Sequence, residues 1–575
     1  MRNYKKNYPL YETTVFRDFR VMTENVAQKY PDGVAFMFRE NPHDPEPTQV
    51  TFTDVKNRVR DLGTGFNALE AKDHQVALIG EASYNWFCAY DALMAIGAVT
   101  VPVDKELPEE DILGILNAAE CTIVCYSASV EEKIMNIKDR IPTLSKLVCL
   151  GKTEAEGVLT IDEIVADGAK RFEEGDHEYY TYEIDPERLA SIVFTSGTTG
   201  KNKGVMLSQK NICTDMTQGM YNFAITRRTM FLLPPQHTFG STVNFVGHFA
   251  QGCTIYITSG LRYMMQEMKE FKPTHLILVP LFVETIYKRI WNSAEKSGKA
   301  GLLRKLIKFS NGARKLGIDM RRKLFKSVLE PLGGNLEMII CGGAALNQDI
   351  IDTFDAVGIT ILNGYGITEC APLISCNRNR YQKKGSVGCP IIGEEVKIAN
   401  PDENGEGEIC VKGPNVMLGY FKNPEATAEA FDEEGFFKTG DYGKLDDEGW
   451  IYITGRLKNL IIFSNGKNVY PEEIENEISR IYGVSEVVVY AGENKAKQIK
   501  EVIVAEIYPD YEALELHGIT KDQVQDYFSE EMKKVNKRMV SYKSVGLVKI
   551  RKEEFPKNTT RKIVRFKIDK NIDND

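Results

Sequence analysis

The sequence contains no apolar run long enough to cross a lipid bilayer. Its longest apolar stretch spans residues 92–103 and is interrupted by Gly97, Thr100 and Pro102, whereas a membrane-spanning helix needs about 20 apolar residues. The chain starts MRNYKKNYPLYETT, which is polar and aromatic and lacks the apolar segment of a signal peptide. We therefore expect a soluble or peripheral cytoplasmic protein, with any membrane contact at the inner face.

The sequence also lacks the cysteine spacing of a metal or redox site and the charge of a nucleic-acid binder. None of its 11 cysteines forms a CxxC pair, so we expect reduced, partly buried thiols. Lys and Arg total 72 against 81 Asp and Glu, a net charge of -9. This balance argues against general nucleic-acid binding.

The order of apolar segments predicts an α/β fold. The 575 residues are 43% hydrophobic and 27% charged, which indicates a folded chain of about three to four domain-sized units. Short apolar runs alternate with helical patterns such as residues 84–98, so we expect parallel sheets covered by helices on both faces. The predicted strands lie at 75–80, 100–103, 121–127, 189–194, 275–280, 336–343 and 358–366.

The pattern changes toward the carboxyl terminus. From about residue 395 short strands are punctuated by glycines, and Asn404-Gly405 is typical of a hairpin. Beyond Gly455 the sequence predicts a compact α+β unit, with helices at 471–483 and near 521–537. We therefore expect an N-terminal domain over 1–455, including a β-rich subdomain at 395–455, a hinge at 456–459, and a small mobile domain over 460–575.

The segment 286–330 is unusually basic. It holds 13 Lys or Arg and three acidic residues, with leucine and isoleucine at helical intervals. Two interpretations stay open: a solvated helical cover on the core, or a surface for anionic lipid or another acidic ligand.

The most specific motif is IVFTSGTTGKNKG at 192–204, an apolar strand that runs into a loop rich in glycine, hydroxyl and lysine residues. Backbone N–H groups, hydroxyls and lysines together solvate a polyphosphate. The loop is not a Walker A motif, because no glycine lies five residues before Gly200 and Asn202 follows Lys201 where Ser or Thr is required. The alternative is a flexible surface loop.

This loop resembles the signature TSGTTGxPKG of the adenylate-forming enzymes, with Asn202 in place of proline. Further segments are similar to that family in the same order along nearly the whole chain. They are LLPPQHTFGST at 232–242, CGGAAL at 341–346, NGYGITEC at 363–370, FFKTGDYG at 436–443, GRLKNLIIFSNGKNVYPEEIE at 455–475 and PKNTTRKIVR at 556–565.

The resemblance implies an ATP site. Tyr365 would pack on adenine, Thr368 would contact the α-phosphate, Glu369 would hold Mg²⁺, and Asp441 would accept hydrogen bonds from the ribose hydroxyls. The implied ATP contacts are Thr195, Ser196, Gly197, Thr198, Thr199, Gly200, Lys203, Gly343, Ala344, Gly364, Tyr365, Gly366, Thr368, Asp441, Arg456 and Lys562.

The resemblance also implies the remaining roles. Lys562 would be the catalytic lysine, together with Thr368 and Glu369, although Arg561 replaces the family's glycine beside it. Lys458 would be the hinge residue, and Gly466 would leave room for a thiol arm. His237 and Phe239 would shape or gate an acyl pocket, unless His237 is an ordinary core imidazole.

The implied reaction is ATP-dependent activation of a carboxylic acid to acyl-AMP, followed by transfer to coenzyme A with release of AMP and pyrophosphate. The long helical region before residue 341 is similar to long-chain fatty acyl-CoA synthetases, so we expect a medium- to long-chain acid. One alternative is a ligase that loads a carrier protein in trans, and another is an inactive nucleotide-binding regulator. The expected partners are the acid, ATP and CoA, with peripheral membrane contact through 286–330. The sequence predicts no oligomeric state.

Overall fold

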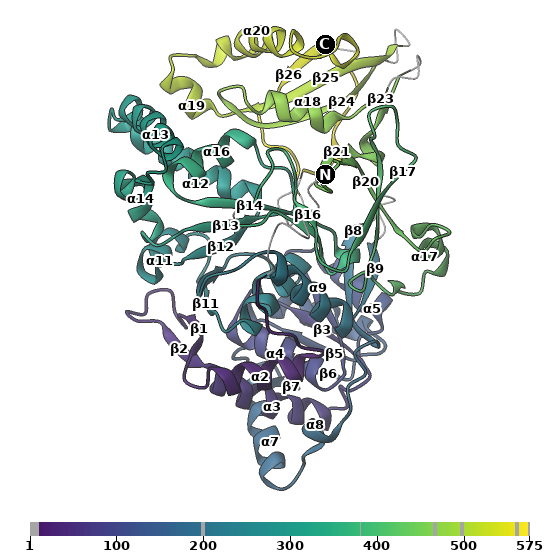
Figure 1. Ribbon diagram of the computed structural model, residues 1–575. Coiled ribbons are helices and arrows are strands. Elements are labelled where there is room, and N and C mark those ends of the chain that lie inside the picture. The colour runs from purple at the N-terminus through teal and green to yellow at the C-terminus, as the bar shows by residue number, and fades with distance from the viewer. Residues whose placement is uncertain are drawn as a thin grey trace. The chain divides into compact units, whose positions relative to one another are not determined.

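The computed structural model describes residues 11–196, 202–379, 381–463, 468–494, 499–557 and 563–572. The chain forms two compact units (Figure 1). The first unit comprises Met1–Val396, Val411–Phe437 and Asp447–Ile451, and the second comprises Lys397–Cys410, Lys438–Asp446 and Tyr452–Asp575.

The largest sheet of the first unit has eight strands in the order β19-β9-β8-β4-β3-β5-β6-β7. From β8 to β7 neighbouring strands are parallel, whereas β9 runs antiparallel to β8 and β19 antiparallel to β9. The strands are β3 (Gln75–Ile79), β4 (Val99–Val103), β5 (Ile123–Tyr126), β6 (Lys146–Cys149), β7 (Val158–Thr160), β8 (Leu189–Ser196), β9 (Asn202–Ser208) and β19 (Gly419–Tyr420).

Helices pack against this sheet and bury its apolar strands. Helices α4 and α5 contact the central strands, α7 contacts β7, and α3 packs on α4 and α7. The strands are continuous apolar runs because they are covered by protein. The helices of this region are α2 (Phe19–Lys29), α3 (Phe52–Ala68), α4 (Tyr84–Ala95), α5 (Glu109–Ala119), α6 (Glu131–Ile137), α7 (Ile161–Glu173), α8 (Glu178–Thr181) and α9 (Gln209–Asn222).

A five-stranded sheet of order β12-β13-β14-β15-β16 supplies the second layer of the first unit. The first three strands are parallel, and β15 and β16 continue antiparallel. The strands are β12 (His275–Leu278), β13 (Met338–Cys341), β14 (Thr360–Gly366), β15 (Leu373–Cys376) and β16 (Cys389–Pro390). The helices before and between these strands are α11 (Met264–Phe271), α12 (Pro280–Lys296), α13 (Ala300–Lys315), α14 (Arg321–Leu324), α15 (Lys326–Leu329) and α16 (Gln348–Val357).

A third sheet of the first unit has the order β10-β11-β1-β2. Its strands are β1 (Val34–Phe38), β2 (Thr48–Thr51), β10 (Arg228–Phe231) and β11 (Thr254–Ile257). Between β10 and β11 the chain forms the wide-turn π-helix η3 (Phe239–Gly247) and the short α10 (His248–Ala250). The unit also contains α17 (Pro424–Ala430).

The second unit is built on a three-stranded sheet, β24 (Val484–Asn494), β25 (Ile499–Pro509) and β26 (Leu547–Ile550). Helix α18 (Pro471–Ile478) packs on β24 and α20 (Val524–Asn536) packs on β26. A four-stranded sheet of order β17-β18-β20-β21 lies mostly in this unit. The remaining elements are β17 (Glu395–Ala399), β18 (Gly407–Lys412), β20 (Phe437–Leu445), β21 (Ile451–Arg456), β22 (Ile461–Ile462), β23 (Asn468–Val469) and α19 (Tyr511–Leu516).

The α/β class expected from the sequence is confirmed, with two differences in detail. The sheets are mixed rather than purely parallel, because antiparallel strands extend all three parallel cores of the first unit. The helix predicted at 471–483 ends at Ile478, and the following turn leads to Gly483, whose φ of +82° suits glycine. All 11 cysteines are free, and all are buried, whereas the sequence predicted partial burial. In the described ranges, no helix has the length and apolarity to cross a membrane.

Candidate active site

The predicted nucleotide-binding segments meet at one edge of the five-stranded sheet. Strands β13 and β14 are parallel neighbours, with Cys341 opposite Asn363. The segments that follow this pair therefore lie at the same edge: Gly343-Ala344 leaves β13, and Gly364–Gly366 continues β14, where it pairs with β15. In open α/β sheets the carboxyl ends of parallel strands are the usual place for a ligand. Gly343 and Ala344 are exposed there, and Gly343 has a φ of +89°, which favours glycine.

Phe239, the predicted acyl-pocket residue, also lies at this edge, close to the backbone of Gly342. A methyl group built on Gly342 would lie 3.2 Å from Cζ of the Phe239 ring and 3.4 Å from the carbonyl oxygen of Gly364. The glycine thus allows the aromatic ring and the Gly364 backbone to sit on the same strand end. The sequence did not link residues 239 and 364, because their proximity depends on how η3 packs.

Tyr365 and Gly366 occupy the last positions of β14. Tyr365 is 7% exposed and pairs with Ser375 across the antiparallel strand β15. A methyl group on Gly366 would lie 2.0 Å from the carbonyl oxygen of Pro372, whereas one on Gly364 would meet nothing closer than 3.7 Å. Gly366 is therefore required by the fold itself, and Gly364 is not.

The predicted phosphate loop joins two antiparallel strands. Thr195 lies opposite Lys203 and Ser196 opposite Asn202. Asn202, Lys203 and Gly204 therefore belong to strand β9, where the sequence analysis expected loop. Thr195 and Lys203 are both half-buried, and strand pairing fixes the spacing of the hydroxyl and the amine at the end of the hairpin.

Glu369, the predicted metal ligand, is linked to this hairpin by Tyr420, a residue that the sequence motifs did not indicate. The Tyr420 hydroxyl donates a hydrogen bond of 3.0 Å to Oε1 of Glu369. The amine of Lys203 lies 4.8 Å from the centre of the Tyr420 ring, within the range of a cation–π contact. Burial, then the negative charge of Glu369, raises the pKa of the Tyr420 hydroxyl, so it stays a donor.

Strand β19 holds Tyr420 in this position. Tyr420 pairs with Val205 of β9, and the N–H of Met417 donates to the carbonyl oxygen of Glu369 at 2.8 Å. The sequence GYFKNPEAT carried no periodic signal that could have revealed a strand of two residues. Thr368, beside Glu369 in the short helix η5 (Thr368–Cys370), is 9% exposed.

His237 caps the turn that leads into η3. The N–H of Phe239 donates to Nδ1 of His237 at 3.2 Å, and the His237 carbonyl accepts from the N–H groups of Gly240 and Ser241. An Nδ1 that accepts a hydrogen bond carries no proton, so in the neutral ring the proton is on Nε2. His237 and Phe239 are both half-buried.

The second unit carries the other described residues that the sequence predicts to contact the nucleotide. Arg456 Nε forms an ion pair of 2.9 Å with Oδ1 of Asp441, whose side chain is 4% exposed. The Asp441 N–H also donates to the Thr439 hydroxyl at 3.1 Å, which fixes the backbone before the carboxylate. The predicted hinge residue Lys458 lies in η6 (Leu457–Asn459). Partial desolvation, then the charge of Arg456, lowers the pKa of its amine.

Several predicted site residues lie outside the described residues. They are Gly197, Thr198, Thr199, Gly200 and Lys201 of the loop, Gly466, and Arg561 with Lys562, together with the side chains of Ser196 and Asn202.

The fold and the grouping of these residues are those expected of a nucleotide-binding α/β enzyme, and comparisons with known proteins specify the family. A family model described as AMP-binding enzyme matches residues 23–421. The chain is 28% identical over 474 residues to the long-chain-fatty-acid–CoA ligase FadD15 of Mycobacterium bovis, covering 77% of this chain and 75% of that protein. It is 29% identical over 535 residues to the chloroplastic long-chain-fatty-acid–[acyl-carrier-protein] ligase AEE15 of Arabidopsis thaliana, covering 80% and 73%.

A solved structure supports the fold over nearly the whole chain. ATP-bound MatB from Rhodopseudomonas palustris superposes with a TM-score of 0.73 at 23% identity, covering 96% of this chain and 98% of that one. The chain belongs to the AMP-binding enzyme family, and the resemblance drawn from its motifs is confirmed.

Proposed function

We propose that this AMP-binding enzyme is an ATP-dependent acid–thiol ligase. It joins a carboxylic acid to AMP with release of pyrophosphate, then transfers the acyl group to coenzyme A. The single observation that carries the proposal is the hydrogen bond that holds the Glu369 carboxylate on Tyr420, beside Lys203 at the end of the β8–β9 hairpin. This arrangement puts a carboxylate and a fixed positive charge next to the predicted phosphate loop.

The first step needs charge neutralisation more than proton transfer. A carboxylic acid with a pKa of about 4 is already ionised at pH 7, so no general base is required. The obstacle is the approach of an anion to a polyphosphate. Lys203, the Thr195 and Thr368 hydroxyls and Lys562 would spread that charge, and one preorganised donor of this kind contributes roughly 10²–10³ in rate.

Mg²⁺ is part of the proposal, and the described residues fit it. In the described part of the chain no three His, Cys, Asp or Glu side chains gather to hold a metal. Mg²⁺ is commonly bound by one or two carboxylates together with substrate phosphates and water, and Glu369 supplies such a carboxylate. The bound ion would neutralise phosphate charge, while Tyr420 keeps the Glu369 oxygens oriented.

The second step passes the acyl group to a thiol. AMP is a good leaving group, and a thiol with a pKa of about 8.5 is partly ionised near neutral pH. We propose that residues 456–459 form a hinge centred on Lys458, which lets residues 460–575 exchange Lys562 for the thiol arm beside Gly466. Asp441 would bind the ribose hydroxyls, and its ion pair with Arg456 supports this role because Arg456 fixes the carboxylate.

The proposed acid is a medium- to long-chain fatty acid, with His237 and Phe239 lining its pocket. The names of the mycobacterial and Arabidopsis relatives support this class of acid. The Arabidopsis relative is named for an acyl-carrier-protein acceptor, which favours one alternative: loading of a carrier protein in trans. We further propose peripheral membrane contact through segment 286–330, supported by its 13 Lys or Arg residues against three acids.

The test is ATP–pyrophosphate exchange with acids of increasing chain length, followed by thioester formation with CoA or with a phosphopantetheinylated carrier protein. We expect exchange that depends on a long-chain acid and thioester formation with CoA. Thioester formation only with the carrier protein would favour the alternative. Absence of exchange with every acid would contradict the ligase and favour an inactive regulator.

A further inference from the structure

Helix α13 exposes three large apolar side chains on one face. Leu302, Phe309 and Leu316, the residue that follows the helix, are 54%, 58% and 81% exposed. They are seven residues apart, which is close to two turns of an α-helix, so they line one side of it. We call these three residues the outer stripe.

Another face of α13 is packed into the first unit. Leu303 is 7% exposed and forms a cluster with the buried Phe325 and Val357, against which Leu306 and Ile307 also pack. The fold thus uses one face of the helix and leaves the outer stripe without a role in the core.

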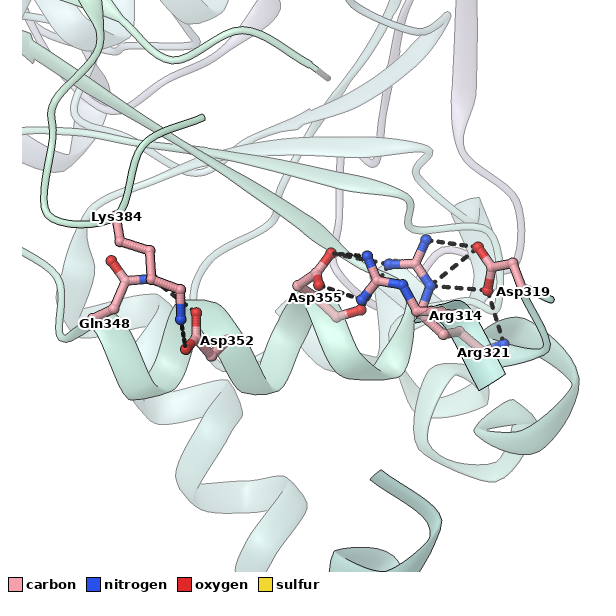
Figure 2. Close-up of polar contacts among 7 residues, drawn as sticks. All are labelled: Arg314, Asp319, Arg321, Gln348, Asp352, Asp355 and Lys384. Atoms are coloured by element: carbon pink, nitrogen blue, oxygen red, sulfur yellow. Dashed lines mark hydrogen bonds and ion pairs between the residues drawn. The ribbon is translucent and has the colours of Figure 1, made fainter. Parts of the chain in front are cut away.

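Ion pairs fix the rotation of the helix on its neighbours. Arg314 of α13 and Arg321 of α14 both reach Asp355 of α16, at 2.5 Å and 3.0 Å, and Arg321 also pairs with Asp319 at 2.7 Å (Figure 2). These contacts lie at the carboxyl end of α13, beside α16 (Figure 1). Because the basic residues on the inner side are paired, the outer stripe is held away from the core.

Lysines lie along one side of the outer stripe. Lys305, Lys308 and Lys315 are exposed on the same helix, and none of them forms an ion pair with another described residue. The whole chain has a net charge of -9. An anionic surface therefore repels the molecule as a whole and attracts it only where positive charge is concentrated, within a Debye length of about 8 Å.

We propose that α13 is an interfacial helix that inserts the outer stripe into the surface of an anionic lipid bilayer. Apolar side chains on one face with lysines beside them suit the boundary between acyl chains and anionic headgroups. A second copy of this chain fits less well, because pairing two such helices would bring their lysines together. The inference deepens the proposed membrane contact of segment 286–330 and rests on that proposed function, but its experimental test is independent of catalysis.

A hollow on the preceding helix supports the same occupant. It is shallow and open to solvent, and it lies along the carboxyl half of α12, lined by Arg289, Asn292, Ser293, Lys296 and Ser297. Two cations with amide and hydroxyl groups match the chemistry of a phosphate headgroup. Residues 297–299 connect this hollow directly to α13.

The experiment measures vesicle binding of the full-length protein. All 11 native cysteines are buried, so Phe309→Cys introduces a thiol that an environment-sensitive dye can label selectively. We expect a blue-shifted, brighter signal on vesicles of phosphatidylglycerol and phosphatidylcholine, and little change on phosphatidylcholine alone. A dye at Leu516→Cys, an exposed leucine of the second unit (51% exposed), is the matched control and should not respond.

Two sets of substitutions separate the contribution of apolar insertion to vesicle binding from the contribution of the lysine charges. Leu302→Ser with Phe309→Ser and Leu316→Ser should weaken vesicle binding at least about tenfold. Lys305→Gln with Lys308→Gln and Lys315→Gln should weaken it on the order of a hundredfold at low salt and much less at high salt. Leu516→Ser should bind like the wild type. All variants should retain pyrophosphate exchange with detergent-dispersed acid.

The outcomes are distinct. Unchanged vesicle binding by both triple variants, or equal wild-type binding to neutral vesicles, would overturn the proposal. A lipid-free dimer in light scattering that the serine triple variant dissociates would also overturn it and assign the stripe to a second copy. Normal vesicle binding without pyrophosphate exchange would contradict the proposed ligase reaction and leave the lipid contact standing.

Discussion

The Tyr420 hydroxyl and the Glu369 carboxylate are joined by a hydrogen bond of 3.0 Å that links positions 51 residues apart. Tyr420 comes from a strand of two residues that extends the eight-stranded sheet, and Glu369 follows the last parallel strand of the five-stranded sheet. The bond therefore connects the two layers at the point where the proposed phosphate and metal contacts lie.

Tyr420→Phe should weaken metal-dependent adenylation. The substitution keeps the ring beside Lys203 but removes a hydrogen bond to a charged group, which contributes about 1.5–3 kcal/mol. We expect pyrophosphate exchange to fall about tenfold and half-maximal activation to need more Mg²⁺. Tyr482→Phe, which removes a 3.0 Å bond from the Tyr482 hydroxyl to the Ala513 carbonyl, is the matched control. The same Mg²⁺ dependence in Tyr420→Phe and wild type would refute the positioning role.

Two glycines of β14 should respond differently to alanine. A methyl group on Gly366 would lie 2.0 Å from the Pro372 carbonyl oxygen, but one on Gly364 has 3.7 Å of space. Gly366→Ala should therefore lower the free energy of unfolding by about 3 kcal/mol or more. Gly364→Ala should have a free energy of unfolding within about 1 kcal/mol of the wild-type value, and it should bind ATP more weakly. Denaturant titration and ATP titration check the two results, and equal destabilisation would show that both glycines are only structural.

Asp441→Asn should affect nucleotide binding more than stability. Arg456, its partner, is 45% exposed, and an ion pair with an exposed partner contributes about 0–1 kcal/mol. Loss of the charged acceptor should raise the KM for ATP about tenfold or more. Glu406→Gln, which removes the 3.0 Å ion pair with Lys444 in the same unit, is a control that should leave the KM unchanged. Weaker folding with an unchanged KM would assign Asp441 to structure alone.

A stacked histidine pair should make the protein sensitive to acid. His248 and His275 are fully buried with ring centres 4.9 Å apart. Burial lowers the pKa of His248 to about 4, and burial, then the neighbouring His248, lowers the pKa of His275. Below the ordinary histidine pKa of about 6.5, these two imidazoles become protonated in the unfolded chain but stay neutral in the folded protein. The contribution of this pair to the free energy of unfolding is therefore fully present above pH 6.5 and decreases as the pH falls toward 4.

Denaturant unfolding at pH 7 and pH 5 measures this effect. Between pH 7 and pH 5, the free energy of unfolding of His248→Gln should fall by about 2 kcal/mol less than that of the wild type. His74→Gln, at an exposed position, should behave like wild type. An unchanged pH dependence in His248→Gln would contradict the role of the pair.

Much of the fold follows from the sequence because buried strands are continuous apolar runs. The strands predicted at 75–80 and 189–194 appear as β3 and β8. The helical nature of 286–330 is likewise confirmed by α12, α13, α14 and α15. The basic composition alone did not reveal which face of α13 is exposed, because that depends on its packing against Phe325 and Val357.

The sequence predicted which segments form the site, but the contacts between those segments could be seen only in the structure. A strand as short as Gly419–Tyr420 has no periodicity, so its pairing with β9 left no mark in the sequence. The approach of Phe239 to Gly342 depends on the wide turns of η3, which follow from packing between segments distant in the chain. Local patterns report burial, whereas these contacts arise from tertiary structure.

The most direct test of the account is acid-dependent ATP–pyrophosphate exchange by the purified full-length enzyme, with hexadecanoate, acetate and no acid compared in parallel. The account predicts exchange with hexadecanoate, little with acetate and none without acid, and conversion of the product to a thioester once CoA is added. Exchange at the same rate without any acid, or none with either acid, would contradict it.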